Sequence, residues 1–206
     1  MKKVLVIPAV VLLTGCLFKK PETPENVADY ENQVPNNLGV DLDIGWTYKE
    51  SGRIEIINND VYINYQRDAG DESFNNSFFA HLKDDGYEYY RKNIQNNTDW
   101  ISFVPVSTDR ENPNALDAVN ALVGITNSAF YDIFNVRVIN GAKLNGTRHI
   151  NDEPVSIYTL GDTAYYISDN INMFMQIAQT GDKDMDWSVK VKSYSTINAF
   201  TDSPSF

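Results

Sequence analysis

Short apolar segments separated by tight-turn residues dominate the second half of the chain. The separators are residues that tolerate the left-handed backbone conformations of tight turns: Asn140-Gly141, Asn151-Asp152-Glu153 and Gly161-Asp162. Parallel strands need connections of a dozen or more residues, so turns this short join antiparallel neighbours. The pattern predicts an antiparallel sheet with strands over 134–139, 142–149, 154–160 and 163–168, closed by a pair over 172–179 and 186–194.

The first half of the chain contains two further strand pairs. The segments 53–56 and 61–65 alternate apolar and polar residues and are joined through Asn58-Asn59-Asp60, which predicts a hairpin. The segments 87–92 and 100–104 flank a polar turn at 95–98 and are expected to pair in the same way.

One segment has the spacing of a helix. Asn112 is suited to cap it, Pro113 to its first position and Gly124 to its end, while apolar residues recur at helical spacing at Ala115, Leu116, Val119, Leu122 and Val123. We expect its apolar stripe to pack on the sheet. Residues 130–134 continue either as a second short helix or as an aromatic lead-in to the next strand. The expected fold class is α+β and β-rich, with a curved antiparallel sheet packed on one or two helices; the alternatives are a plain sandwich and an α+β sheet with one covered face.

The amino terminus has the layout of a secretory signal. Lys2 and Lys3 precede an apolar run over 4–13, and small residues lead to Cys16. The run is too short to cross a bilayer of about 30 Å as a helix. Leu13-Thr14-Gly15-Cys16 resembles the lipobox of bacterial lipoproteins, which implies cleavage between Gly15 and Cys16 and attachment of acyl chains such as palmitate to Cys16. A plain secreted protein whose signal ends near a cysteine is the alternative.

The lipobox resemblance implies a membrane-anchored protein of the cell envelope, in the outer membrane if the host is Gram-negative. Each buried CH₂ of an acyl chain contributes roughly 0.8 kcal/mol, so several chains hold a protein on a membrane firmly. Residues 1–15 are then the signal peptide, and residues 16–39 are expected to form the acylated end and a flexible tether, because they are rich in Pro, Asn and Glu and lack apolar periodicity. A short helix over 27–33 is the alternative for part of the tether. Residues 40–206 form a single expected domain.

The chain from Asp85 onward resembles the half-barrel lipoproteins of the LolA and LppX/LprG type. The resemblance rests on Asp85-Gly86-Tyr87-Glu88-Tyr89-Tyr90 with Trp100, on Lys143 to Arg148 with Pro154 to Tyr158, and on the closing pair with Pro204. In that family a strongly curved sheet wraps around helices and encloses an apolar cavity. The resemblance implies that this protein binds a lipid or another apolar molecule there.

The sequence contains no recognisable catalytic, metal or cofactor motif. With 17 basic against 28 acidic residues the net charge is −11, which gives no basic surplus for binding nucleic acid. His81 and His149, the only histidines, are not at ligand spacing, and the acidic run 182–186 lacks the glycine and glutamate of a calcium loop, because Trp187 and Ser193 stand in their places. We therefore expect a protein that is not an enzyme and carries no metal or cofactor.

Aromatic residues are the remaining candidates for ligand binding. There are 3 Trp, 12 Tyr and 10 Phe, which either fill the core or line an apolar surface. The candidate ligand-binding residues are Trp46, Trp100, Phe130, Phe134 and Trp187. The predicted function is binding of a lipid or other apolar ligand in a cavity of the curved sheet. The alternative is a structural or assembly role, in which an aromatic face docks another envelope protein.

Overall fold

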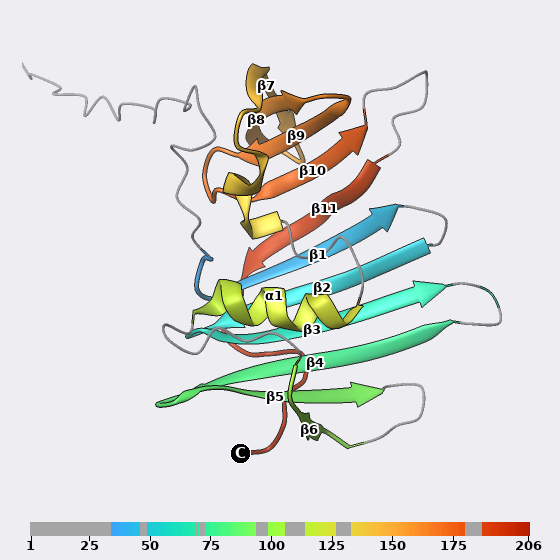
Figure 1. Ribbon diagram of the computed structural model, residues 1–206, viewed down its shortest axis with the longest axis vertical. Coiled ribbons are helices and arrows are strands. Elements are labelled where there is room, and N and C mark those ends of the chain that lie inside the picture. The colour runs from blue at the N-terminus through green and yellow to red at the C-terminus, as the bar shows by residue number, and fades with distance from the viewer. Residues whose placement is uncertain are drawn as a thin grey trace, which may run out of the picture.

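The protein forms one large antiparallel sheet, shown in the computed structural model of Figure 1. The structure describes residues 34–45, 49–68, 70, 73–93, 99–105, 114–126, 133–179 and 187–206. Within them, eleven strands pair in the order β6-β5-β4-β3-β2-β1-β11-β10-β9-β8-β7. The sheet is not closed into a barrel, so β6 and β7 are its edges. The expected β-rich class with a curved antiparallel sheet is confirmed.

The strands form two meanders that meet in the middle of the sheet. The first comprises β1 (Leu38–Gly45), β2 (Lys49–Ile57), β3 (Asp60–Asp68), β4 (Phe74–Lys83), β5 (Gly86–Asn93) and β6 (Ile101–Phe103). The second follows helix α1 (Ala115–Thr126) and the 3₁₀ helix η4 (Val136–Ile139), and comprises β7 (Lys143–Ile150), β8 (Glu153–Leu160), β9 (Thr163–Ser168), β10 (Phe174–Gln179) and β11 (Trp187–Thr196). The last strand pairs with the first, and this joins the two halves.

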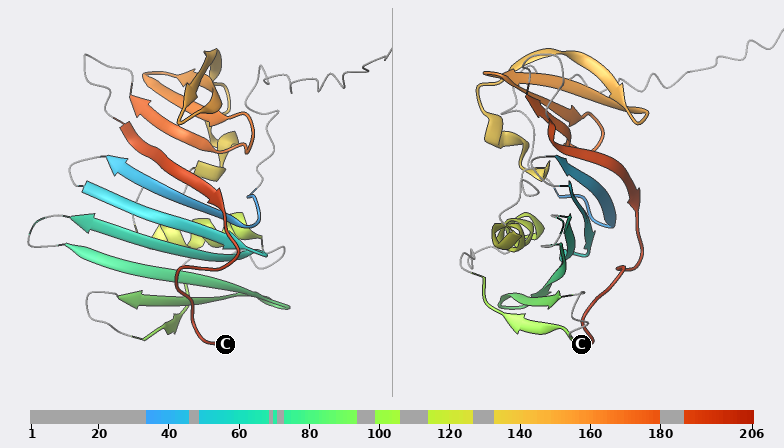
Figure 2. Two further views of the ribbon diagram at one scale, coloured as in Figure 1. Left: turned by 180° about the vertical axis from the view of Figure 1, so that it is seen from behind. Right: turned by 90° about the vertical axis from the view of Figure 1, so that its right-hand side faces the viewer.

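The sheet curves around α1, which lies in its concavity (Figure 2, right). Side chains at matching positions of neighbouring strands form the concave core: Val40 is paired with Ile54, Ile54 with Ile63 and Ile63 with Phe78. The helix buries Ala118, Val119 and Leu122 in the same core and packs on β3 and β4. Burying one large aliphatic or aromatic side chain contributes about 1.5–3 kcal/mol, so this layer is the main source of stability.

The segment before β7 covers the rest of the core and differs from the expected strand over 134–139. Phe134, Val136 and Ile139 are all buried, yet residues 136–139 form the 3₁₀ helix η4. A short apolar run has no periodicity that separates a strand from a tight helix, and here the chain covers the sheet instead of joining it. Residues 130–132, for which a second short helix is one alternative, lie outside the described residues.

Part of the convex face of the sheet is covered by the chain's own C-terminal segment, residues 197–206. This segment follows β11 and runs over the outside of the sheet to β4 and β5 (Figure 2). Phe200 packs edge-on against Phe79 of β4 with ring centroids 4.9 Å apart. Lys92 of β5 pairs with Asp202 at 3.0 Å. The C-terminal segment therefore gives β4 and β5 a second covering layer, on the face opposite the concave core.

The predicted strand pairs and helix are otherwise confirmed. The hairpin turn between β2 and β3 uses Asn58 and Asn59 at φ of 51° and 71°, and β5 pairs with β6 as expected. The described cap of α1 is Asn114, whose Oδ1 accepts a hydrogen bond of 3.0 Å from the N–H of Asp117. The expected cap Asn112 lies outside the described residues, and the helix continues to Thr126, past Gly124.

The described chain begins at residue 34, so the signal peptide 1–15 and the lipid-attachment site lie outside it. Val34 packs against the core and β1 begins at Leu38, two residues before the expected start of the domain. None of the described helices is long and apolar enough to span a membrane.

Candidate functional site

An incompletely covered row of aromatic side chains lies on the concave face of β4, β5 and β6. We call it the concave aromatic strip; its members are Phe74, Phe78, Tyr87, Tyr89 and Phe103. Phe103 is central, with its ring centroid 6.4 Å from that of Phe78 and 6.2 Å from that of Tyr89. Phe78 and Tyr89 are buried, whereas Phe74, Tyr87 and Phe103 are only half-buried. The strip thus has some rings in the core and others that reach the surface.

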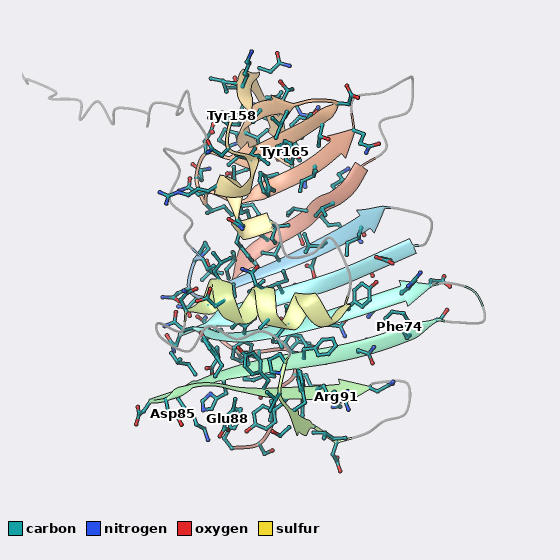
Figure 3. All side chains as sticks on the ribbon, in the orientation of Figure 1. Phe74, Asp85, Glu88, Arg91, Tyr158 and Tyr165 are labelled. Atoms are coloured by element: carbon teal, nitrogen blue, oxygen red, sulfur yellow. The ribbon has the colours of Figure 1, made fainter. Side chains whose placement is uncertain are left out.

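Strand alternation places these residues on the face that carries α1. On β5, Tyr87, Tyr89 and Arg91 share one face, while Glu88, Tyr90 and Lys92 point to the other. The register aligns Tyr89 with the core residue Ala80, and Arg91 lies between Phe78 of β4 and Ile101 of β6. Figure 3 shows Arg91 and Phe74 toward the same end of β5 and β4.

The phenols of the strip remain uncharged over the ordinary pH range. Burial raises the pKa of Tyr89 to about 12, and the carboxylate of Asp117 on α1 acts in the same direction. Burial likewise raises the pKa of Tyr87 well above its ordinary value, helped by the neighbouring Tyr89 phenol. A neutral aromatic surface is suited to an apolar ligand, because no charge has to lose its water when the ligand binds.

Two arginines flank the strip, and they differ in their partners. The guanidinium of Arg67 lies 5.9 Å from the centroid of Phe74 and pairs with Glu50 at 3.5 Å. The guanidinium of Arg91 lies 6.0 Å from the centroid of Phe103. Arg91 is exposed, and the described part of the chain offers it no carboxylate partner. Beside it, Ile101 has 52 % of its surface exposed.

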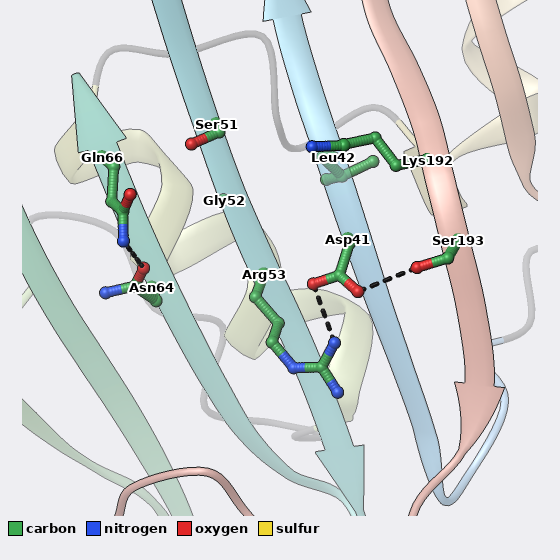
Figure 4. Close-up of a pocket in the computed structure, with 9 residues that line it drawn as sticks. All are labelled: Asp41, Leu42, Ser51, Gly52, Arg53, Asn64, Gln66, Lys192 and Ser193. Atoms are coloured by element: carbon green, nitrogen blue, oxygen red, sulfur yellow. Dashed lines mark hydrogen bonds and ion pairs between the residues drawn. The ribbon is translucent and has the colours of Figure 1, made fainter. Parts of the chain in front are cut away.

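A separate pocket of about 330 Å³ lies on the convex face, across β3, β2, β1 and β11 (Figure 4). Polar side chains line it and bond to one another: Arg53 donates to Asp41 at 2.8 Å, Ser193 to Asp41 at 2.9 Å and Gln66 to Asn64 at 3.2 Å. Its chemistry does not suit an apolar ligand, and most of its charged atoms are engaged within the wall. We assign it no function.

A buried polar cluster centred on Glu153 joins β8 to the β9–β10 turn and to β11. Its carboxylate accepts hydrogen bonds from Ser168, from Asn170 at 3.1 Å and from Tyr194 at 2.5 Å. Ser168 in turn accepts the N–H groups of Asn170 and Ile171, each at 3.1 Å. Every member thus has a partner in the fold, which indicates a structural role.

No potential metal cluster occurs in the described ranges. His81 bonds to Asp60 at 2.9 Å and stacks on Phe206, with ring centroids 4.2 Å apart. His149 is exposed on the edge strand β7. The acidic run 182–186 lies outside the described residues.

The structure separates the ligand-binding candidates that the sequence suggested. Trp100 packs against Tyr62 and Phe79 of the convex face, with centroid distances of 6.5 and 6.2 Å. Phe134, by contrast, is fully buried in the concave core. Trp187 pairs through its backbone with Ala178 in β10. The remaining candidates and the lipobox residues lie outside the described residues: Trp46, Phe130, Gly15 and Cys16.

The concave aromatic strip is a site that selection by residue type missed. The signal is present in the alternation of β5, where Tyr87, Tyr89 and Arg91 occupy every second position. The choice of tryptophans and of Phe130 and Phe134 as candidates does not use that alternation, and none of those residues belongs to the strip. Comparison with known proteins adds no assignment, since no protein-family model and no curated protein matched the chain.

Proposed function

We propose that this protein is a membrane-anchored lipoprotein that binds a lipid or another apolar molecule without catalysing a reaction. The observation that carries the proposal is the concave aromatic strip, a neutral aromatic surface whose half-buried rings lie beside exposed Ile101. Apolar ligands are typically held on concave surfaces lined by aromatic side chains with few polar groups.

The packing beneath α1 favours a site beside the helix over one beneath it. Ala115, Ala118, Val119 and Leu122 are buried against the sheet, so the helix fills the concavity that it covers. Exposed side chains of the concave face occur on β5 and β6, at Arg91 and Ile101. The proposal therefore puts the ligand along β5 and β6, with its apolar part against Phe103.

The alternative role, docking of another envelope protein through an aromatic face, is less well supported. The convex aromatic side chains Phe79 and Tyr90 are in contact with Phe200 or Phe206 of the protein's own C-terminal segment. A docking partner would have to displace that segment. On the concave face, the exposed residues Arg91 and Ile101 are not aromatic, so they do not supply the aromatic face that the docking role needs.

The binding proposal is tested by analysing what the protein carries out of the cell. The full chain with Cys16→Ser, which cannot be acylated, is purified without detergent, extracted with organic solvent and examined by mass spectrometry. We expect a lipid at a defined molar ratio. Phe103→Asp should lose it, because a carboxylate at the centre of the strip must be desolvated when the ligand binds.

The matched control is Phe206→Asp, which places the same charge on the convex face, where 68 % of Phe206 is exposed. Circular dichroism establishes that both variants remain folded. Absence of any extractable apolar molecule from the Cys16→Ser protein, together with co-purification of an envelope protein, would favour the docking role.

Anchoring is tested separately. We expect wild-type protein in the membrane fraction and Cys16→Ser in the aqueous fraction, because only a thiol forms the thioether to diacylglycerol. Mass spectrometry of wild-type protein should show the added acyl mass on a chain that begins at Cys16. An unmodified thiol, or a retained leader, would contradict the lipoprotein assignment.

A further inference from the structure

The cation on the concave aromatic strip has an unusual position. Arg91 lies between Phe78 and Ile101 in the sheet register, and its guanidinium is within 6.0 Å of the Phe103 ring centroid. The exposed cation therefore stands on the apolar face of β5, while the polar residues Glu88 and Lys92 occupy the opposite face. In a chain of net charge −11, an arginine without an acidic partner among the described residues is unexpected at such a place.

The other charged groups near the strip already have partners. Arg67, which lies beside Phe74, is paired with Glu50. Glu88 of the opposite face bonds to Lys83 at 2.8 Å and to Tyr90 at 2.7 Å. Arg91 has neither an ion pair nor a hydrogen-bond acceptor among the described side chains. Its planar fork of N–H donors is thus available to a ligand.

We infer that the ligand of the concave aromatic strip is an anionic amphiphile, whose acidic headgroup pairs with Arg91 and whose acyl chain lies on Phe103 and Ile101. This inference rests on the proposed function and specifies the ligand class. Arginine matches the geometry of carboxylate and phosphate groups by donating two parallel hydrogen bonds. A headgroup held at Arg91 leaves the acyl chain next to the rings of the strip. The charged part of the ligand is then paired while its apolar part is in contact with apolar side chains.

The experiment compares a charged and an uncharged ligand with the same chain. The full chain carrying Cys16→Ser is titrated with cis-parinaric acid, a fluorescent fatty acid, and with its methyl ester. We expect the acid to bind at least about tenfold more tightly than the ester, the ratio that 1.4 kcal/mol of headgroup pairing produces. Arg91→Gln should weaken binding of the acid to the level of the ester and leave the ester unchanged, while Arg91→Lys should retain part of the preference.

Two controls separate the contributions of charge and chain. Lys192→Gln removes one positive charge from the opposite face of the sheet, where the Lys192 side chain is 55 % exposed, and should leave both affinities unchanged. Inorganic phosphate at millimolar concentration presents an anion without a chain, and it should not displace the acid.

The outcomes distinguish this inference from the proposed function. Equal affinity for acid and ester, unaffected by Arg91→Gln, would leave the apolar site in place and overturn the assignment of an anionic headgroup. Displacement by phosphate alone would also overturn it, since the site would then be a simple anion site. Failure of both acid and ester to bind would overturn the proposed function itself.

Discussion

One buried carboxylate, Glu55, anchors the C-terminal segment to the convex face in addition to the ring contacts and the Lys92–Asp202 ion pair, and it is the most informative position for a stability test. Glu55 is 1 % exposed. Its Oε1 accepts hydrogen bonds of 2.5 Å from Arg53 Nε and from Thr201 Oγ1, and its Oε2 accepts one of 2.7 Å from the Thr201 N–H. Glu55→Gln keeps the shape of the side chain and removes its charge.

The expected cost follows from the donors that lose an acceptor. The NH₂ group that Glu55→Gln introduces faces at least one N–H or O–H donor in either orientation, since both carboxylate oxygens of Glu55 accept hydrogen bonds. Hydrogen bonds to a charged group contribute about 1.5–3 kcal/mol each, and loss of one partner in a buried charged pair costs about 3–5 kcal/mol. Because the Arg53 side chain is 26 % exposed and can turn toward water, we expect a loss near the lower limit, about 3 kcal/mol.

The assay is thermal unfolding of the full chain carrying Cys16→Ser. At about 2–4 °C per kcal/mol for a chain of this size, Glu55→Gln should lower the melting temperature by roughly 6–12 °C. Thr201→Val, which removes one of the three hydrogen bonds to the charged group, should cost about 1.5 kcal/mol, the lower limit for such a bond. Hydrogen exchange of the Thr201 amide should accelerate in Glu55→Gln, which reports release of the segment even in a destabilised protein.

The control is Glu88→Gln, on the same face of the sheet, whose carboxylate is exposed and bonded to Lys83 and Tyr90. An exposed pair contributes little, so the melting temperature should stay close to the reference value. Equal melting temperatures for Glu55→Gln and Glu88→Gln would refute the reasoning that the buried carboxylate holds the segment.

Three further perturbations follow from the same structure. The pKa values of Tyr89 and Tyr194 are raised to about 12, mainly by burial. Because these folded values exceed the unfolded value of about 10, the stability that the two phenols contribute is complete below about pH 10 and is lost as the pH rises toward 12. Absorbance of the phenolate should show a late titration, and its amplitude should be smaller in Tyr89→Phe. Phe79→Ala should cost about 3–5 kcal/mol in urea unfolding, whereas Phe206→Ala, at a residue 68 % exposed, should cost far less. Gly161→Ala should cost about 1–2 kcal/mol, because this glycine has a φ of 59° with open space around its missing Cβ, and Gly161→Asn should cost less.

Strand pairs with one covered face and a short turn could be predicted from the sequence. The β2–β3 hairpin alternates apolar and polar residues on each side of Asn58 and Asn59, and both asparagines adopt the left-handed conformation that the turn requires. The rhythm of β7 to β9 is equally clear, because its turns contain Asn, Asp or Gly at the positions that need positive φ.

Strand β4 could not be recognised in this way, because it is covered on both faces. Phe78 and Ala80 point into the concave core, while Phe79 lies under Phe200 of the C-terminal segment. The resulting run of consecutive apolar residues has no alternation, and the covering segment is far away along the chain. Long-range cover of this kind leaves no local pattern.

The candidate site was only partly accessible to sequence reasoning for a related reason. The sequence identifies aromatic residues as a class, but their division between the two faces depends on strand register. Trp100 and Phe103 are close in sequence, yet Trp100 contacts convex Phe79 and Phe103 contacts concave Phe78. Which of them can contact a ligand on the concave face is decided by β6, a strand of three residues.

The edges of the open sheet give a last argument for the site. An edge strand invites pairing with other chains unless it is short, charged or bulged. β7 carries Lys143 and Arg148 and has a register shift between Leu144 and Thr147, with Gly146 at a φ of 123°. β6 is protected by its short length, and exposed apolar side chains do not themselves protect an edge.

Exposed apolar side chains on β6 therefore need another reason. Ile101 is 52 % exposed, and Val104, directly after the strand, is 81 % exposed. Neither completes the core, and Ile101 lies beside the one arginine of the strip that has no acidic partner among the described residues. An apolar chain with an acidic end would cover Ile101 and neutralise Arg91 together, so a single ligand accounts for two features that the fold itself does not require.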